Sequence, residues 1–325
     1  VMDWHADRFH ENYHSPDFDA SRWVPAEELS PELCAKWNLR KWNLPPLAEC
    51  EVLPRKGRVL FEDLKPYADC SGDLTLTALP GPPVSFQLEF EQEIAAHVGF
   101  EVESAGGASI RLEYQEVPGV THAFEKYTTA PGVHRFRSTR LNVFRYVLVC
   151  VGCGTFSSER VAPVKIRAFT AHRRGFPLGA TAPFQCSDPD LEAIRDCIDK
   201  TMRMCMMRLH LDSPVHQEGL GCTGDYRIEA LITHALYGET RLAAADILRT
   251  SLLLKQKNAF MFHTSYSLFF IDMVREYYWN TGDAELPERV FPQIEAVLDR
   301  FAGFVGADGL VSEAPNYMFI DWVND

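Results

Sequence analysis

The sequence lacks two features that would place it in other classes of protein. No apolar run approaches the ~20 residues that span a bilayer. Basic residues number 32 against 45 acidic ones, which gives a net charge of −13. A nucleic-acid binder needs a basic face to neutralise phosphates, and an anionic membrane surface repels an acidic protein. We therefore expect neither a nucleic acid nor a membrane as partner, and a neutral substrate agrees best with this charge.

A regular cysteine pattern is also missing. The nine cysteines are scattered, and only Cys150 and Cys153 form a close pair. One CxxC without a second pair or a nearby His cluster is weak evidence for zinc. Because this pair ends an apolar run, we interpret it as buried thiols and expect no metal and no cofactor. Unpaired thiols favour a reducing, cytoplasmic compartment. A bacterial periplasmic or secreted location is the alternative.

The first half of the chain is patterned for β-structure. Residues 1–55 are irregular and rich in Trp, His and Pro, and we interpret them as a linker, or as the tail of an earlier β-domain. From 56 onward the apolar period is two, as in 84–91 and 110–115, and Pro- and Gly-rich turns separate the runs. Alternating strands with such breaks predict an antiparallel, jelly-roll-like β-sandwich over 56–185.

The second half has helical periodicity. Asp188 is a plausible N-cap with Pro189 at the first helical position. The methionines of 202–207 recur at helical spacing and are interpreted as core residues rather than a soft-metal site. Gly238 and Gly282 lie in two similar joints, 44 residues apart, which fits serial αα-hairpins. We expect helices at about 187–209, 225–237, 241–256, 264–279 and 285–304, so that 186–325 forms the first part of a toroidal helical barrel.

The strongest chemical signal is the loop from Asp212 to Asp225. Its sequence, Asp-Ser-Pro-Val-His-Gln-Glu-Gly-Leu-Gly-Cys-Thr-Gly-Asp, holds three carboxylates and three glycines between two helices. Such carboxylates are costly unless they cap helices, pair with cations or handle protons. Glu218 is the best candidate for acid–base chemistry, because neither helix periodicity nor a nearby cation explains it. Asp212 can instead be a turn former, and Asp225 a helix N-cap.

In this order of elements the sequence resembles the bacterial α-L-rhamnosidases of glycoside hydrolase family 78. Members carry the signature Asp-Cys-Pro-…-Glu-Arg-…-Gly-Trp-Thr-Gly-Asp at the entry to an (α/α)6 barrel, and the loop 212–225 is similar to it. The segment 184–191 before the loop, and the later segments 277–283 and 319–322, are similar to the family as well. The resemblance covers roughly residues 40–325. It implies a carbohydrate substrate and leaves the oligomeric state open.

The resemblance also implies roles for single residues. Glu218 matches the general acid of an inverting enzyme that cleaves terminal α-L-rhamnosyl residues. The positions implied to contact the substrate are Asp212, His216, Asp225, Asp321 and Trp322.

Three departures bear on which sugar is bound. Cys222 stands where the family has a Trp that stacks on the sugar, Gly219 replaces an Arg after the acid, and His216 replaces an Arg before it. Another (α/α)6-barrel glycosidase with a different sugar, and a non-catalytic carbohydrate-binding relative, therefore stay open.

The chain starts at Val1 and stops at Asp325 without terminal punctuation, and we expect a piece of a longer protein. The family's general base is a Glu far downstream, so we expect it outside this chain. In an incomplete barrel some inner apolar side chains lose their partners. We expect partial exposure of Leu252, Phe269 and Phe270 for this reason.

Overall fold

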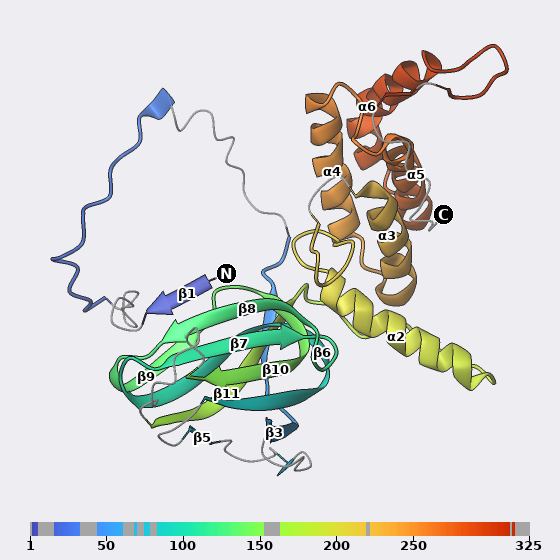
Figure 1. The fold of residues 1–325 in the computed structure, drawn as a ribbon. Coiled ribbons are helices and arrows are strands. Elements are labelled where there is room, and N and C mark those ends of the chain that lie inside the picture. Colours follow the sequence, from blue (N-terminus) through green and yellow to red (C-terminus); the bar gives the residue numbers. More distant parts are fainter. Residues whose placement is uncertain are drawn as a thin grey trace. The chain divides into compact units, whose positions relative to one another are not determined.

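The computed structural model describes residues 2–5, 16–32, 44–60, 68–69, 75–78, 83–152, 163–218, 222–312 and 314–315. The chain divides into two compact units (Figure 1). One comprises Val1–Asn43 and Glu49–Arg174, and the other Leu44–Ala48 and Gly175–Asp325. The first unit is built of β-strands and the second of helices. No helix within the described ranges has both the length and the apolar character to cross a membrane.

A large sheet forms the first unit. Its order is β1-β8-β7-β10-β6-β11-β2, with β3 and β9 also paired to β6, β4 to β3 and β5 to β11. The pairings of β6 with β3, β9, β10 and β11 are antiparallel, whereas β1 runs parallel to β8. The strands are β1 Met2–His5, β2 Ala48–Val52, β3 Lys56–Leu60, β4 Ala68–Asp69, β5 Leu76–Ala78, β6 Val84–Ala105, β7 Ser109–Gln115, β8 Thr121–Thr128, β9 Pro131–Arg137, β10 Asn142–Val151 and β11 Val164–Gly175.

Strand β6 organises this sheet because it is 22 residues long and has different partners along its length. Its first part, 84–89, pairs with β3 and β10. Its last part, 99–105, pairs with β9 and β11. The register with β10 shifts between Phe144 and Tyr146, and the register with β11 shifts between Arg167 and Thr170. Such irregularities bend a strand and increase its twist, which lets one strand serve both parts.

The period-two pattern predicts strands correctly at 84–91, 110–115 and 144–150. The alternate polar residues of β6 are nevertheless not all solvated. Gln87 is buried; its Oε1 accepts from Arg58 Nη2 at 2.6 Å, and its Nε2 lies 3.4 Å from Gln115 Oε1. Ser85 is buried as well and donates to the thiol of Cys150. Both faces of this part of the sheet are therefore covered, and the polar side chains satisfy one another.

The second unit contains five long helices among the described residues. They are α2 Pro189–Cys205, α3 Thr223–Tyr237, α4 Arg241–Gln256, α5 Thr264–Thr281 and α6 Glu285–Ala302. The predicted N-cap is confirmed, since Asp188 Oδ1 accepts from the Asp190 amide at 2.9 Å with Pro189 next to it. Gly238 and Gly282 end α3 and α5 in the left-handed region, with φ of 62° and 70°. A residue with a Cβ is strained there, so both joints need glycine.

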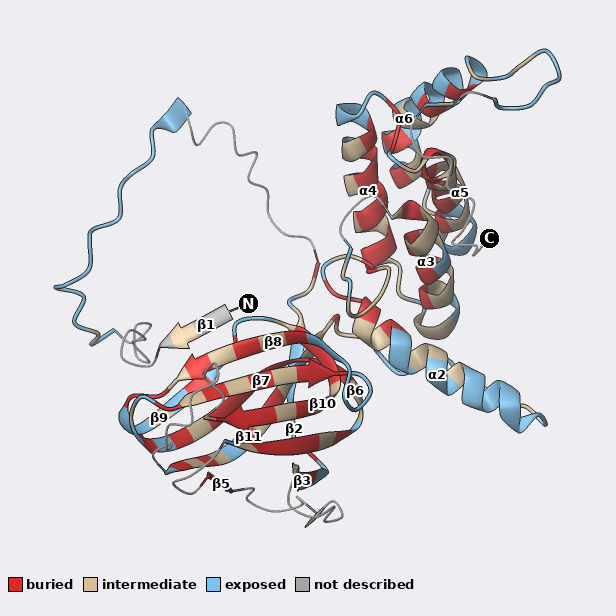
Figure 2. Ribbon diagram, in the orientation of Figure 1, coloured by how far each residue is buried: buried red, intermediate tan, exposed pale blue. Residues whose placement is uncertain are grey.

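The core of the helical unit lies between α3, α4, α5 and α6, whose facing sides are buried (Figure 2). Tyr226 and Phe270 are completely buried in it. The expectation of partial exposure is wrong for Phe270, because it points into this core, and is confirmed for Leu252 (60 % exposed) and for Phe269 (half-buried). Met202 and Met206 are core residues, as predicted.

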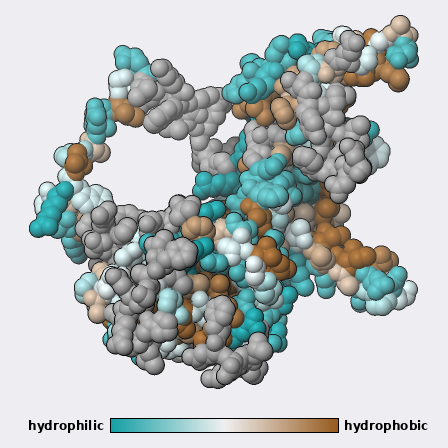
Figure 3. All heavy atoms as spheres, viewed as in Figure 1, coloured by the Kyte–Doolittle hydropathy of each residue, from teal (hydrophilic) through white to brown (hydrophobic). Residues whose placement is uncertain are grey.

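Helix α2 is exposed over most of its length (Figure 2). Leu191 and Ile194 lie among its exposed residues, and brown apolar surface follows this helix in Figure 3.

Candidate active site

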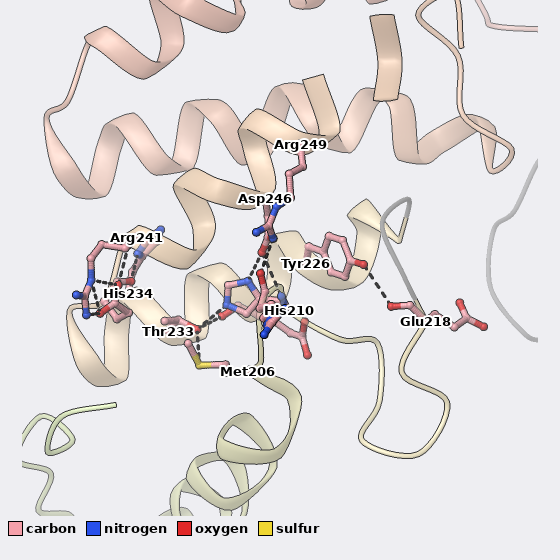
Figure 4. A network of polar contacts seen from close by, with 12 residues as sticks. Met206, His210, Glu218, Tyr226, Thr233, His234, Arg241, Asp246 and Arg249 are labelled. Atoms are coloured by element: carbon pink, nitrogen blue, oxygen red, sulfur yellow. Dashed lines mark hydrogen bonds and ion pairs between the residues drawn. The ribbon is translucent and has the colours of Figure 1, made fainter. Parts of the chain in front are cut away.

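The segment that joins α2 to α3 is anchored by a buried histidine. His210 is inaccessible to solvent, and its Nδ1 lies 2.7 Å from Oδ2 of Asp246 on α4 (Figure 4). Its Nε2 lies 3.1 Å from Oγ1 of Thr233 on α3, and its backbone amide donates to the same Asp246 oxygen at 3.2 Å. Two helices therefore fix the start of the loop. The sequence reasoning missed this anchor, because His210 and Asp246 are 36 residues apart.

The carboxylate of Asp212 closes the first half of the loop. Its Oδ1 accepts from the backbone amide of Glu218 at 2.7 Å. Ser213 Oγ accepts from the amide of His216 at 3.1 Å, and the exposed His216 ring places Nδ1 3.7 Å from Asp212 Oδ2. Gln217 has a φ of +52°, a strained conformation for a residue with a side chain. Asp212 thus forms a turn, which the sequence analysis gave as one possible role for it, and in doing so it fixes the backbone of Glu218.

Glu218 is contacted at its backbone and at its side chain. Tyr226 lies on α3, and its hydroxyl donates to the carbonyl oxygen of Glu218 at 3.4 Å (Figure 4). The thiol of Cys222 donates to Glu218 Oε2 at 3.0 Å. The residue is exposed, so its carboxyl group can be reached from solvent.

Asp225 lies in the first turn of α3 and is not the N-cap. That position belongs to Cys222, whose side chain makes no capping hydrogen bond. Tyr266 Oη donates instead to Asp225 Oδ2 at 3.4 Å. Burial raises the pKa of Asp225; its hydrogen bonds oppose this, and the negative charges of Asp212 and Glu218 add to it. Helix α3 starts two residues earlier than expected, so Asp225 lies inside it and is turned toward α5.

A fourth carboxyl group, Glu229, lies one helical turn after Asp225 on α3. It is only 9 % exposed, and its Oε2 has no hydrogen-bond partner among the described residues. Burial, and then the charges of Asp225 and Asp246, raise its pKa to about 9. Glu229 is therefore protonated at neutral pH. The i, i+4 spacing from Asp225 was the signal in the sequence that could have identified it.

The loop therefore brings together three of the sequence-predicted residues, Asp212, Glu218 and Asp225, with His216 at its exposed edge. Asp321, Trp322 and Gly219 fall outside the described residues. Within those residues, no set of three His, Cys, Asp or Glu side chains is arranged to hold a metal ion. Several carboxyl groups with different environments, beside tyrosine and thiol donors, are suited to proton transfer and to binding hydroxyl groups.

Comparison with known proteins gives this arrangement a context. Residues 179–325 match the family model of the bacterial alpha-L-rhamnosidase 6 hairpin glycosidase domain. No curated protein sequence matches the chain significantly.

Three solved structures are similar in fold. The rhamnosidase of glycoside hydrolase family 78 from Bacillus sp. GL1 has a TM-score of 0.69 at 22 % identity, over 77 % of this chain and 27 % of that one. The rhamnosidase from Klebsiella oxytoca with rhamnose bound has a TM-score of 0.68 at 18 % identity, over 86 % and 61 %. The Streptomyces avermitilis α-L-rhamnosidase complexed with L-rhamnose has a TM-score of 0.50 at 19 % identity, over 71 % and 25 %. This chain thus spans about a quarter of the Bacillus protein and 61 % of the Klebsiella protein.

Proposed function

We propose that this chain, whose residues 179–325 belong to the family of bacterial α-L-rhamnosidase six-hairpin glycosidase domains, is part of a glycoside hydrolase that removes terminal α-L-rhamnosyl residues from a carbohydrate. One observation carries the proposal. The segment that matches the family contains an exposed carboxyl group, Glu218, which Asp212, Cys222 and Tyr226 hold in place.

In this proposal Glu218 is the general acid. Hydrolysis with inversion needs one carboxylic acid to protonate the leaving oxygen, and a second carboxylate ~6.5–9.5 Å away to activate water on the opposite face of the sugar. We assign the second role to a later part of the barrel than residues 179–325. Asp212, Asp225 and His216 are assigned to the sugar hydroxyls, and Asp321 and Trp322 to the same substrate pocket.

The architecture proposed with this function has three parts. Residues 1–55 are an N-terminal segment that adds β1 and β2 to the sheet, 56–185 a jelly-roll-like β-sandwich, and 186–325 the first portion of an (α/α)6 barrel. The αα-hairpin series of α3 to α6, with glycine at two joints, supports the barrel, since such hairpins are its repeating unit. A toroid of this kind has loops at both of its ends, and in this proposal the Asp212–Asp225 loop lies at the end that meets the substrate.

A second candidate is a related glycosidase that takes a different sugar. Cys222 favours it, because this small side chain stands at the position of a stacking tryptophan and leaves more space beside Glu218. Both candidates use the same acid, and they differ in the glycone that is cleaved.

The test compares aryl α-L-rhamnosides with poor and activated leaving groups, in the full-length protein that carries this chain. Glu218→Gln is nearly isosteric but cannot deliver a proton. We expect at least a ~100-fold loss of kcat on the poor leaving group and a smaller loss on the activated one. Glu295→Gln, the same exchange at an exposed position of α6, is the control and should have no effect. Equal losses on both substrates would contradict the acid role. Activity of the unmutated protein on another aryl glycoside alone would favour the second candidate.

A further inference from the structure

Cys222 occupies an N-cap position without capping its helix. Residues at this position normally accept a hydrogen bond from an amide of the first turn through a side-chain oxygen. In α3 the backbone carbonyl of Cys222 accepts from the amides of Asp225 and Tyr226, both at 3.1 Å, and its side chain takes no part. The thiol is directed at Glu218 Oε2 instead, at 3.0 Å. The cysteine is therefore used for a contact across the loop.

The contact acts on the side chain of Glu218, whose backbone is already held by neighbouring residues. The amide of Glu218 is held by Asp212 and its carbonyl by Tyr226, so the backbone is fixed on both sides. The side chain extends from this fixed backbone through rotatable single bonds. A hydrogen-bond donor on one carboxyl oxygen favours one rotamer of the Glu218 side chain and leaves the other oxygen available to the substrate.

We propose that Cys222 is a positioning residue for Glu218, whose thiol orients the carboxyl group toward the leaving oxygen of the substrate. This inference rests on the proposed function, in which Glu218 is the acid. It explains why a small sulfur side chain is suited to this position: the thiol reaches one oxygen and adds no bulk at the other. A thiol is also a weak donor. It therefore restricts the carboxyl group without competing strongly with a substrate oxygen.

The chemistry of the thiol is consistent with this role. Burial comes first, then the hydrogen bond to Glu218 and the negative charges of Glu218, Asp225 and Asp212; together they hold the pKa of Cys222 far above its ordinary value. The sulfur therefore keeps its proton at neutral pH. A protonated thiol can donate to the carbonyl oxygen of a carboxylic acid, as the acid role of Glu218 requires, and it is a poor nucleophile, since the thiolate is the reactive form.

The first experiment tests the contact without measuring hydrolysis. Iodoacetamide labelling of the full-length protein at pH 8, read at each cysteine by peptide mass spectrometry, is compared between the unmutated protein and Glu218→Gln. The exchange removes the negative charge and replaces one acceptor oxygen by an amide NH2 donor, so we expect Cys222 to react at least ~3-fold faster in the variant. Cys197, an exposed thiol on α2, is the internal control and should react equally in both. An unchanged rate at Cys222 overturns the proposal.

The second experiment tests the positioning role. Cys222→Ser keeps a donor of similar size, and Cys222→Ala removes it. On the rhamnoside with the poor leaving group we expect Ser to stay within about 2-fold of the unmutated kcat and Ala to lose up to about 10-fold, the effect of one hydrogen bond. The activated substrate should be nearly unaffected in both variants. Equal behaviour of Ala and Ser, or losses independent of the leaving group, contradicts the positioning role. A different outcome would contradict the proposed function itself: in that case Glu218→Gln hydrolyses the rhamnoside at the unmutated rate, whatever the labelling shows.

Discussion

His210 and Asp246 form a fully buried pair in which Nδ1 lies 2.7 Å from Oδ2, and Arg249 contacts the other oxygen of Asp246 at 3.4 Å. Because neither side chain is accessible, removal of Asp246 leaves the Nδ1 and the backbone amide of His210 buried without their acceptor. We expect Asp246→Ala to lower the free energy of unfolding by about 2–5 kcal/mol, since each buried donor left without an acceptor costs about 1–3 kcal/mol. Arg275→Ala, which breaks an exposed pair with Asp272, should cost less than about 1 kcal/mol. Urea unfolding followed by circular dichroism measures both, and comparable losses would refute the anchoring role.

Glu229 gives a pH dependence of stability whose sign follows from its raised pKa. Below about pH 4.5 the group is protonated in the folded and unfolded chains alike. Between pH 4.5 and about 9 the unfolded chain ionises first, so this group makes folding less favourable as pH rises through the window, and its effect is constant above it. Glu229→Gln removes the ionisation and should increase stability at pH 7, by on the order of 3 kcal/mol at most.

The measurement for Glu229 is the difference in unfolding free energy between variant and unmutated protein at pH 5, 7 and 9. The difference should grow across the series. Glu295→Gln, an exposed exchange on α6, provides the baseline and should show no such growth. A difference that is constant with pH would mean that Glu229 is already ionised at pH 5.

Gly224 lies where a side chain would collide with Tyr266. A Cβ at this position would be 2.6 Å from Cε1 and 2.8 Å from Cζ of the Tyr266 ring. We expect Gly224→Ala to destabilise the protein by about 1–3 kcal/mol, despite the better helix propensity of alanine. Gly179→Ala is the matched control, because no atom lies within 4 Å of its added Cβ. In a Tyr266→Ala background the cost of Gly224→Ala should largely disappear. Thermal unfolding of both single variants, the double variant and Gly179→Ala measures this, and an equal cost of Gly224→Ala in both backgrounds would mean that the collision with Tyr266 is not its cause.

The sequence predicted the local elements well where one residue decides the outcome. Asp188 and Pro189 start α2, and the left-handed glycines Gly238 and Gly282 end α3 and α5. The side-chain contacts between residues far apart in the chain could not be predicted from the sequence. Nothing in the sequence pairs His210 with Asp246, and the burial of Glu229 depends on helices that pack only in three dimensions.

The candidate loop shows the same division. Its carboxylates were found from composition, because Asp212, Glu218 and Asp225 stand out among glycines. Composition did not show which role each of the three carboxylates has. Asp212 holds a backbone amide because of the geometry of the turn. Asp225 faces Tyr266 and does not cap α3, because the helix starts two residues earlier than expected.

The length of β6 has a consequence for how the β-unit loses its structure. One continuous strand is bonded to β3 and β10 near its start and to β9 and β11 near its end. Neither part of the sheet can detach without exposing hydrogen-bonding groups of a strand that the other part still holds. The unit should therefore open as one cooperative block, with the amides of β6 exchanging with solvent at a single slow rate set by global unfolding.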